Sequence, residues 1–201
     1  MHERRIALEK KASEYCTDYL LKKQNISNMY REIYVYGFEL FFSTVFTGFT
    51  IFLIGTIFFK ASFSLIFITI FTSLRILNGG YHADTFTKCF IYSNFFFIIS
   101  VLPVYHSAIL LSGYTYVIIG FMSGIVILFL GPLLDKCQEK LYSQKKKFQI
   151  YTLGLLIIYI SISIFLLFFY KSNPYIVVIS NTLLLVAVLQ LKVKFDRLLR
   201  K

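Results

Sequence analysis

Residues 36–59 read YGFELFFSTVFTGFTIFLIGTIFF, and Glu39 is the only charged residue among them. About 20 helical residues are needed to cross a hydrocarbon layer of ~30 Å, so this stretch is long enough to cross it. It therefore predicts a membrane-spanning helix.

Further apolar stretches follow it at residues 63–77, 85–102, 109–130, 148–170 and 175–191, of which the first is short. The 201-residue chain is 57% hydrophobic and 15% charged, with a mean hydropathy of +0.70, which a water-soluble domain of this size cannot bury. We expect an all-α, polytopic integral membrane protein of about six transmembrane helices. It forms a single domain, with the bundle at 36–191 and a basic tail at 192–201.

The segment 1–33 is polar, yet apolar residues recur in it at near-helical intervals, namely Ile6, Leu8, Ala12, Tyr15, Tyr19, Leu20 and Ile26. This pattern predicts an amphipathic helix that lies on the membrane surface. A solvated helix packed on the protein's own cytoplasmic loops fits the pattern equally well.

The positive charge of the chain is unevenly placed. All Lys and Arg residues except Lys60 and Lys171 fall in the two ends or in alternate connections between the apolar stretches. The positive-inside rule then places both termini and the loops at 78–84 and 131–147 in the cytoplasm. A nucleic-acid partner is not expected, because the aromatic residues lie in the apolar runs and not among the basic residues.

Polar residues gather between the second and third apolar stretches, where residues 75–89 read RILNGGYHADTFTKC. Polar groups at membrane depth are costly, so such a cluster is a candidate functional site. Cys89 is a candidate nucleophile and His82 a candidate base, since an imidazole can accept the proton of a thiol. On one continuous helix these two residues would lie ~10.5 Å apart, too far for proton transfer. The chain must therefore bend between them.

Gly79 and Gly80 offer this bend, because glycine adopts dihedral angles that other residues avoid. Asp84 or Thr85 could then cap a new helix and place Cys89 in its early turns, where the helix dipole favours a thiolate. The sequence thus predicts a glycine hinge that folds His82 back over the start of the third span.

The same stretch resembles the signature of the accessory gene regulator protein B (AgrB) family, membrane cysteine endopeptidases of Gram-positive bacteria, in the types and spacing of Arg75, Gly80, His82 and Cys89. The resemblance implies a plasma-membrane enzyme without a cofactor that cuts the carboxy-terminal tail from an AgrD-type precursor peptide. The remaining peptide is held as a thioester on Cys89 and then closes to a thiolactone or lactone quorum-sensing signal. Arg75 and Gly80 match positions that the family needs for activity. The chain could also form a homodimer.

Other roles remain open from the residues themselves. Asp84 could orient His82, ahead of Asn78 or Glu39, although a helix cap is the simpler role for Asp84. Arg75 could orient a carboxylate, stabilise an oxyanion or be structural.

The basic loop that ends in Lys145, Lys146 and Lys147 could steer the acidic tail of a precursor or grip anionic lipid headgroups. Cys16 and Cys137 are expected to be bystanders.

Two functions other than a cysteine peptidase are open to a membrane protein with this polar stretch. A small transporter or channel would need a polar path through Glu39, Arg75 and His82, but the matching broken helices of such proteins are not apparent in both halves. A metalloprotease or serine protease would need motifs such as HExxH or GxSxG, which the sequence lacks. We therefore expect no metal.

Overall fold

The computed structural model describes residues 2–24, 31–78, 86–105, 112–133, 145–170 and 173–199. Within these ranges the chain is helical, and its elements are α1 (His2–Gln24), α2 (Arg31–Phe58), α3 (Ala61–Asn78), α4 (Phe86–Val101), the 3-10 helix η2 (Leu102–Val104), α5 (Gly113–Leu130), α6 (Lys145–Phe169) and α7 (Pro174–Leu199). Six of them, α2 to α7, are long and apolar enough to cross a membrane, α4 together with η2. The prediction of an all-α protein with six spans is confirmed.

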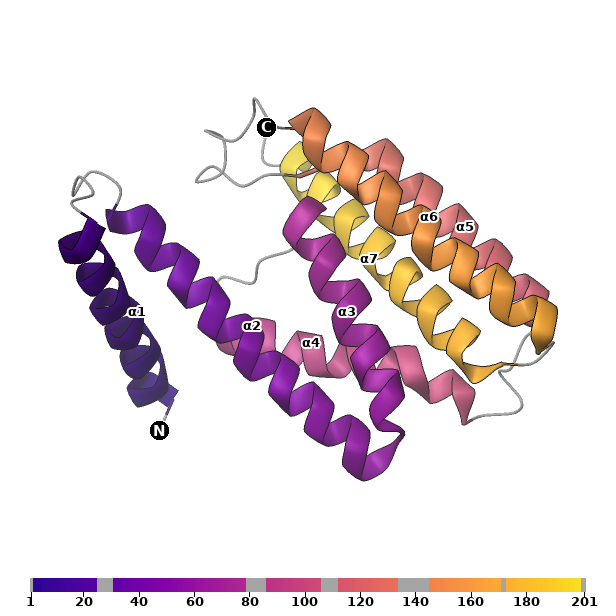
Figure 1. Ribbon diagram of the computed structural model, residues 1–201, viewed down its shortest axis with the longest axis horizontal. Helices are drawn as coiled ribbons and strands as arrows, with labels where there is room; N and C mark the ends of the chain where they lie inside the picture. Colours follow the sequence, from indigo (N-terminus) through magenta and orange to yellow (C-terminus); the bar gives the residue numbers. More distant parts are fainter. Residues whose placement is uncertain are drawn as a thin grey trace.

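Four of the spans, α3, α4, α5 and α6, pack against α7, and α2 packs against α3 and α4. In Figure 1, α5, α6 and α7 lie together on one side, α2 lies on the other, and α3 stands between them. Over half of the apolar window of α7 is buried, the largest share among the six spans. A helix that is apolar all round suits this central position.

The core between these helices is rich in phenylalanine. On α3, buried Phe63, Phe67, Phe71 and Leu74 recur at helical spacing and form one face. The Phe67 ring lies against the ring of Phe97 from α4, with centroids 5.4 Å apart in an edge-to-face arrangement. This face fixes how α3 is turned toward its neighbours, and therefore which way the polar residues at its end point.

Small residues let the helices approach closely at two places. A Cβ added at Gly55 in α2 would lie 2.5 Å from the Ser64 hydroxyl oxygen of α3, and one at Gly120 in α5 would lie 3.1 Å from the Ser180 hydroxyl oxygen of α7. Such contacts stabilise helix pairs in lipid, where no hydrophobic force drives helices together. They hold α2 against α3 and α5 against α7.

One end of the bundle is tied together by polar contacts at Asn78, the last residue of α3. The backbone N–H of Leu133 donates to the Asn78 carbonyl oxygen at 2.7 Å. The Thr152 hydroxyl of α6 donates to the buried side-chain oxygen of Asn78 at 3.0 Å, and Arg197 of α7 lies 3.5 Å from the Leu133 carbonyl oxygen. The carboxyl ends of α3 and α7 and the amino end of α6 therefore meet at the same end.

Helix α1 packs against α2 (Figure 1). Its buried residues Ser13, Thr17 and Leu21 are spaced four apart. Arg31 at the start of α2 donates to both carboxylate oxygens of Asp18, at 2.9 and 3.3 Å, and this bond holds the pKa of Asp18 below its ordinary value. The expected helix is present and packs on the first span, while its position on a membrane surface stays a prediction.

The helix ends differ modestly from the predicted ones. Helix α2 begins at Arg31, before the predicted residue 36, and α7 continues to Leu199 through the segment predicted as a basic tail. Helix α3 begins at Ala61, directly after Lys60, and ends at Asn78, so it is short, as expected. Its 18 residues span ~27 Å, slightly less than a typical hydrocarbon layer of ~30 Å.

Candidate active site

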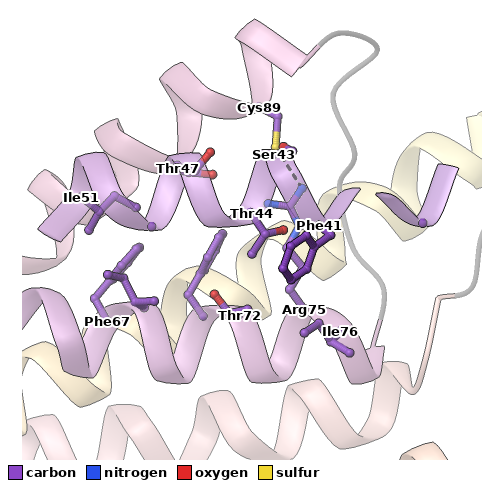
Figure 2. Close-up of a pocket in the computed structure, with 15 residues that line it drawn as sticks. Phe41, Ser43, Thr44, Thr47, Ile51, Phe67, Thr72, Arg75, Ile76 and Cys89 are labelled. Atoms are coloured by element: carbon purple, nitrogen blue, oxygen red, sulfur yellow. Dashed lines mark hydrogen bonds between the residues drawn. The ribbon is translucent and has the colours of Figure 1, made fainter. Parts of the chain in front are cut away.

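Two residues of the motif, Arg75 and Cys89, are brought into contact. Arg75 lies in the last turn of α3, and Cys89 is the fourth residue of α4, which begins at Phe86. A guanidinium N–H of Arg75, on Nη2, donates to Cys89 Sγ at 3.3 Å, as the dashed line in Figure 2 shows. Helix α3 ends at Asn78 and α4 begins at Phe86, so Arg75 and Cys89 lie on two different helices.

The guanidinium of Arg75 is held from its own helix as well. Its central carbon lies 5.6 Å from the centroid of the Phe71 ring, one turn earlier on α3, in a cation–π contact. Phe71 is itself buried, so its ring is a fixed platform. The positive group of Arg75 is therefore directed toward α4 and not simply extended into solvent.

This contact has a chemical consequence for the sulfur. Arginine keeps its positive charge at any ordinary pH, and its N–H groups bond more strongly to an anion than to a neutral group. Cys89 is half-buried and lies in the first turns of α4, where the positive end of the helix dipole adds to the effect. A positive side chain and the amino end of a helix thus both lie next to the Cys89 sulfur.

A cavity of about 340 Å3 opens beside this pair, between α2, α3 and α4. Its lining residues come from these three helices and are Gly37, Phe41, Ser43, Thr44, Thr47, Gly48, Ile51, Phe67, Ile68, Phe71, Thr72, Arg75, Ile76, Cys89 and Ser93. Figure 2 shows Cys89 and Arg75 at one part of it and Ile51 and Phe67 at another. The volume is near the lower end of ligand pockets, roughly 300–1,000 Å3, so it can hold part of a peptide.

The cavity is mostly apolar but carries hydroxyl groups that the sequence analysis missed. Ser43, Thr44 and Thr47 from α2 line it, and Thr47 shares a helix face with the other two because it follows them by four and three residues. Thr47 is buried, and its hydroxyl oxygen has no hydrogen-bond partner among the residues that the structure describes. The signal in the sequence was this group of hydroxyl residues inside an otherwise apolar span.

The remaining predicted site residues are not all covered by the structure. His82, Gly80 and Asp84 lie outside the described residues, so the distance from His82 to Cys89 and the predicted hinge stay predictions. Glu39 is not one of the described residues that line the cavity, although Arg75 is.

Lys145, Lys146 and Lys147 form the first residues of α6, and the last two are exposed. Cations are unfavourable at the amino end of a helix, so these lysines do not serve the stability of α6. Thr152, which bonds Asn78, lies one to two turns further along α6. The lysines therefore lie at the same end of the bundle as the carboxyl end of α3.

The other cysteine that the structure describes, Cys16, is half-buried on α1. In the described part of the chain, no three His, Cys, Asp or Glu side chains are grouped so that they could hold a metal ion.

Comparison with known proteins gives a family. The sequence profile described as Accessory gene regulator B matches residues 13–191, which include the whole of the first five spans, most of α7 and the whole motif from Arg75 to Cys89. No curated protein and no solved structure matches the chain.

Proposed function

The chain belongs to the accessory gene regulator B family, and from this premise we propose that it is a membrane-embedded cysteine endopeptidase that processes an AgrD-type precursor peptide for quorum sensing. The observation that carries the proposal is the 3.3 Å contact between Arg75 and Cys89 Sγ beside a cavity. A cysteine that only fills space in a membrane helix needs neither a charged partner nor a cavity next to its sulfur.

In the proposed reaction, His82 accepts the proton of the Cys89 thiol. The sulfur attacks the carbonyl carbon at the cleavage point, and the S–C bond forms as the C–N bond breaks. The proton passes from His82 to the departing amine of the carboxy-terminal tail. The amino-terminal part of the peptide remains as a thioester on Cys89.

Ring closure follows from the same thioester. A thiol or hydroxyl within the bound peptide gives its proton to His82 and attacks the thioester carbonyl, so the new S–C or O–C bond forms as the bond to Cys89 breaks and Cys89 leaves as a thiolate. A thioester keeps much of the reactivity of the acyl group, so this step needs protection from water more than further activation. Arg75 lies about 4.5 Å before the end of α3, three residues at 1.5 Å each, which supports a site just inside the membrane boundary.

Arg75 has a defined part in this scheme. It stabilises the sulfur anion before attack and again when Cys89 leaves, because it is already within hydrogen-bonding distance of Sγ. This role is more specific than two others that the sequence left open for Arg75, namely the orientation of a carboxylate and a purely structural role.

The lysines at the start of α6 would attract an acidic tail toward the same end of the bundle. We assign this end to the cytoplasm of a bacterial plasma membrane, because nearly all basic residues of the sequence fall in its two ends or in the connections that the positive-inside rule places on that side. If the lysines steer, replacing all three with Gln lowers kcat/KM for precursor at low salt, and the difference shrinks as salt screens the attraction.

The central test uses the purified protein in lipid vesicles with a synthetic precursor. Mass spectrometry should show an adduct on Cys89 whose mass equals the precursor without its tail. Cys89→Ala and His82→Gln should abolish cleavage, whereas Cys16→Ala on α1 should not. Cleavage that persists in Cys89→Ala would overturn the proposal.

A further inference from the structure

The last turn of α3 carries Arg75, which contacts the Cys89 sulfur, and it ends at Asn78. The last four carbonyl groups of an α-helix have no partner further along the same helix, so a last turn frays unless other groups hold it. In α3 these are the carbonyl groups of residues 75–78. The place of the Arg75 guanidinium therefore depends on what holds this turn from outside α3.

Asn78 provides such a hold, because both of its carbonyl oxygens face donors from other elements. Its backbone oxygen accepts from the N–H of Leu133, which follows α5, at 2.7 Å. Its side-chain oxygen lies 3.0 Å from the hydroxyl oxygen of Thr152 on α6. That hydroxyl oxygen also lies 2.9 Å from the Phe148 carbonyl oxygen, so its one proton is shared between two acceptors. The end of α3 is thus fixed to two other parts of the bundle.

The burial of Asn78 shows that packing does not explain its amide. Asn78 is only 1% exposed, and its side-chain nitrogen has no partner among the residues that the structure describes. Burying an amide that is incompletely bonded is unfavourable, and an apolar side chain of similar size would fill the same space without this penalty. The amide is therefore accounted for by its bond to Thr152, one turn beyond Arg75 along α3.

From these observations we propose that Asn78 is a positioning residue for Arg75. Through Thr152 and Leu133 it holds the last turn of α3 in place, so that the guanidinium stays on the Cys89 sulfur. Asn78 does not line the cavity beside Cys89, and it acts only through Arg75. The inference rests on the proposed function, since it assumes that the charge of Arg75 stabilises the sulfur anion of Cys89.

A second hydrogen bond between α3 and α6 offers a matched control. The hydroxyl oxygens of Ser73 and Tyr159 lie 2.9 Å apart. Ser73 precedes the last turn, so its backbone carbonyl has a partner within the helix. Its hydroxyl also lies within hydrogen-bonding distance of the carbonyl oxygens of Thr69 and Ile70. The Tyr159 bond therefore joins the same two helices without holding the turn that carries Arg75.

The test measures how fast iodoacetamide alkylates Cys89 in the whole protein in lipid vesicles, with mass spectrometry to identify the modified cysteine. Thr152→Val keeps the shape of the side chain and removes the hydroxyl. We expect it to slow alkylation about 2- to 5-fold, the lower part of the range for one hydrogen bond, because the proton is shared. Thr152→Ser keeps the hydroxyl and should restore the rate. Tyr159→Phe removes the other hydroxyl that joins α6 to α3 and should leave the rate unchanged.

Asn78→Ala gives a second reading from the α3 side. It removes the side-chain oxygen and leaves the backbone bond to Leu133. Alkylation should slow in this variant as well, by no more than in Arg75→Gln, because Asn78 acts only through Arg75.

A double-variant cycle separates positioning from a general loss of stability. In a protein that already carries Arg75→Gln, Thr152→Val should have no further effect on the alkylation rate, because the contact that it disturbs is already gone. A change that loosens the whole bundle would alter the rate by the same factor in both backgrounds.

Three results would overturn the inference. They are equal alkylation rates in Thr152→Val, Asn78→Ala and the unchanged protein, a slowing that persists in the Arg75→Gln background, and an equal slowing in Tyr159→Phe. Because none of these measurements needs a precursor, they also separate this inference from the proposed function. Precursor cleavage that depends on Cys89, with alkylation insensitive to Thr152→Val, removes the inference alone. The expected slowing in a protein that does not cleave precursor keeps Asn78 as a positioning residue and removes the precursor as substrate.

Discussion

Replacing Arg75 with Gln should slow every reaction that begins with the sulfur anion of Cys89. The guanidinium N–H lies 3.3 Å from Sγ. Two unit charges at this distance attract by about 5 kcal/mol at an effective dielectric constant of about 20, which is an upper bound before solvation is counted. Hydrogen bonds to charged groups contribute about 1.5–3 kcal/mol net. A thiolate that loses such a bond is also a stronger nucleophile, which offsets roughly half of this free energy, so the expected rate loss is about 4- to 15-fold.

The assay is the rate of Cys89 alkylation by iodoacetamide at neutral pH, followed by mass spectrometry, because it needs no precursor. Arg75→Lys keeps the charge but loses the planar fork, so its rate should fall between those of Arg75→Gln and the unchanged protein. Lys88→Gln removes a positive charge next to Cys89 in sequence. Since Lys88 is exposed, solvent screens its charge, and Lys88→Gln should change the alkylation rate of Cys89 by less than about threefold.

The direction of the change separates this role from a structural one. If Arg75→Gln only loosened the helix pair, Cys89 would become more accessible and would react faster. A slower reaction therefore reports loss of the stabilised anion. An Arg75→Gln protein that reacts within threefold of the unchanged protein, or faster, would refute the reasoning.

Three further changes test the packing. Gly55→Ala should lower the stability of the protein in detergent by about 1–3 kcal/mol, because the added Cβ would fall 2.5 Å from a side-chain oxygen of α3. Gly48→Ala, whose Cβ meets only an ordinary contact, should be near neutral. Equal melting temperatures of the two variants would contradict this. Thr152→Val should cost about 1–3 kcal/mol in the same assay, since it leaves a buried amide oxygen at the end of α3 without its donor. The pKa of Asp18 is lowered from 3.8 by the bond from Arg31, so this contact supports the α1–α2 pair above that pH and is lost as the pH falls through the lowered value. An Asp18 carboxyl whose pKa, followed by NMR, is at or above 3.8 would contradict it.

The motif around Cys89 could be found in the sequence because its residues lie within one short polar stretch. The sequence predicted the break between two helices and placed Cys89 in the early turns of the second, where α4 begins at Phe86. It offered three roles for Arg75 and did not include a contact with Cys89. The bond between them depends on how α3 and α4 meet, which no pattern within 15 residues specifies.

By itself the sequence determined the number of spans and their approximate ends, and it predicts which end of the bundle carries the positive charge. These properties follow from hydropathy and charge along the chain, and the bilayer acts on each segment almost independently. Tertiary structure alone decided which faces of the spans look inward, and so joined Thr47, Thr72 and Cys89 around one cavity. The physical reason is that lipid and protein core are equally apolar, so the faces of these helices differ little in composition and only interlocking side chains fix their rotation.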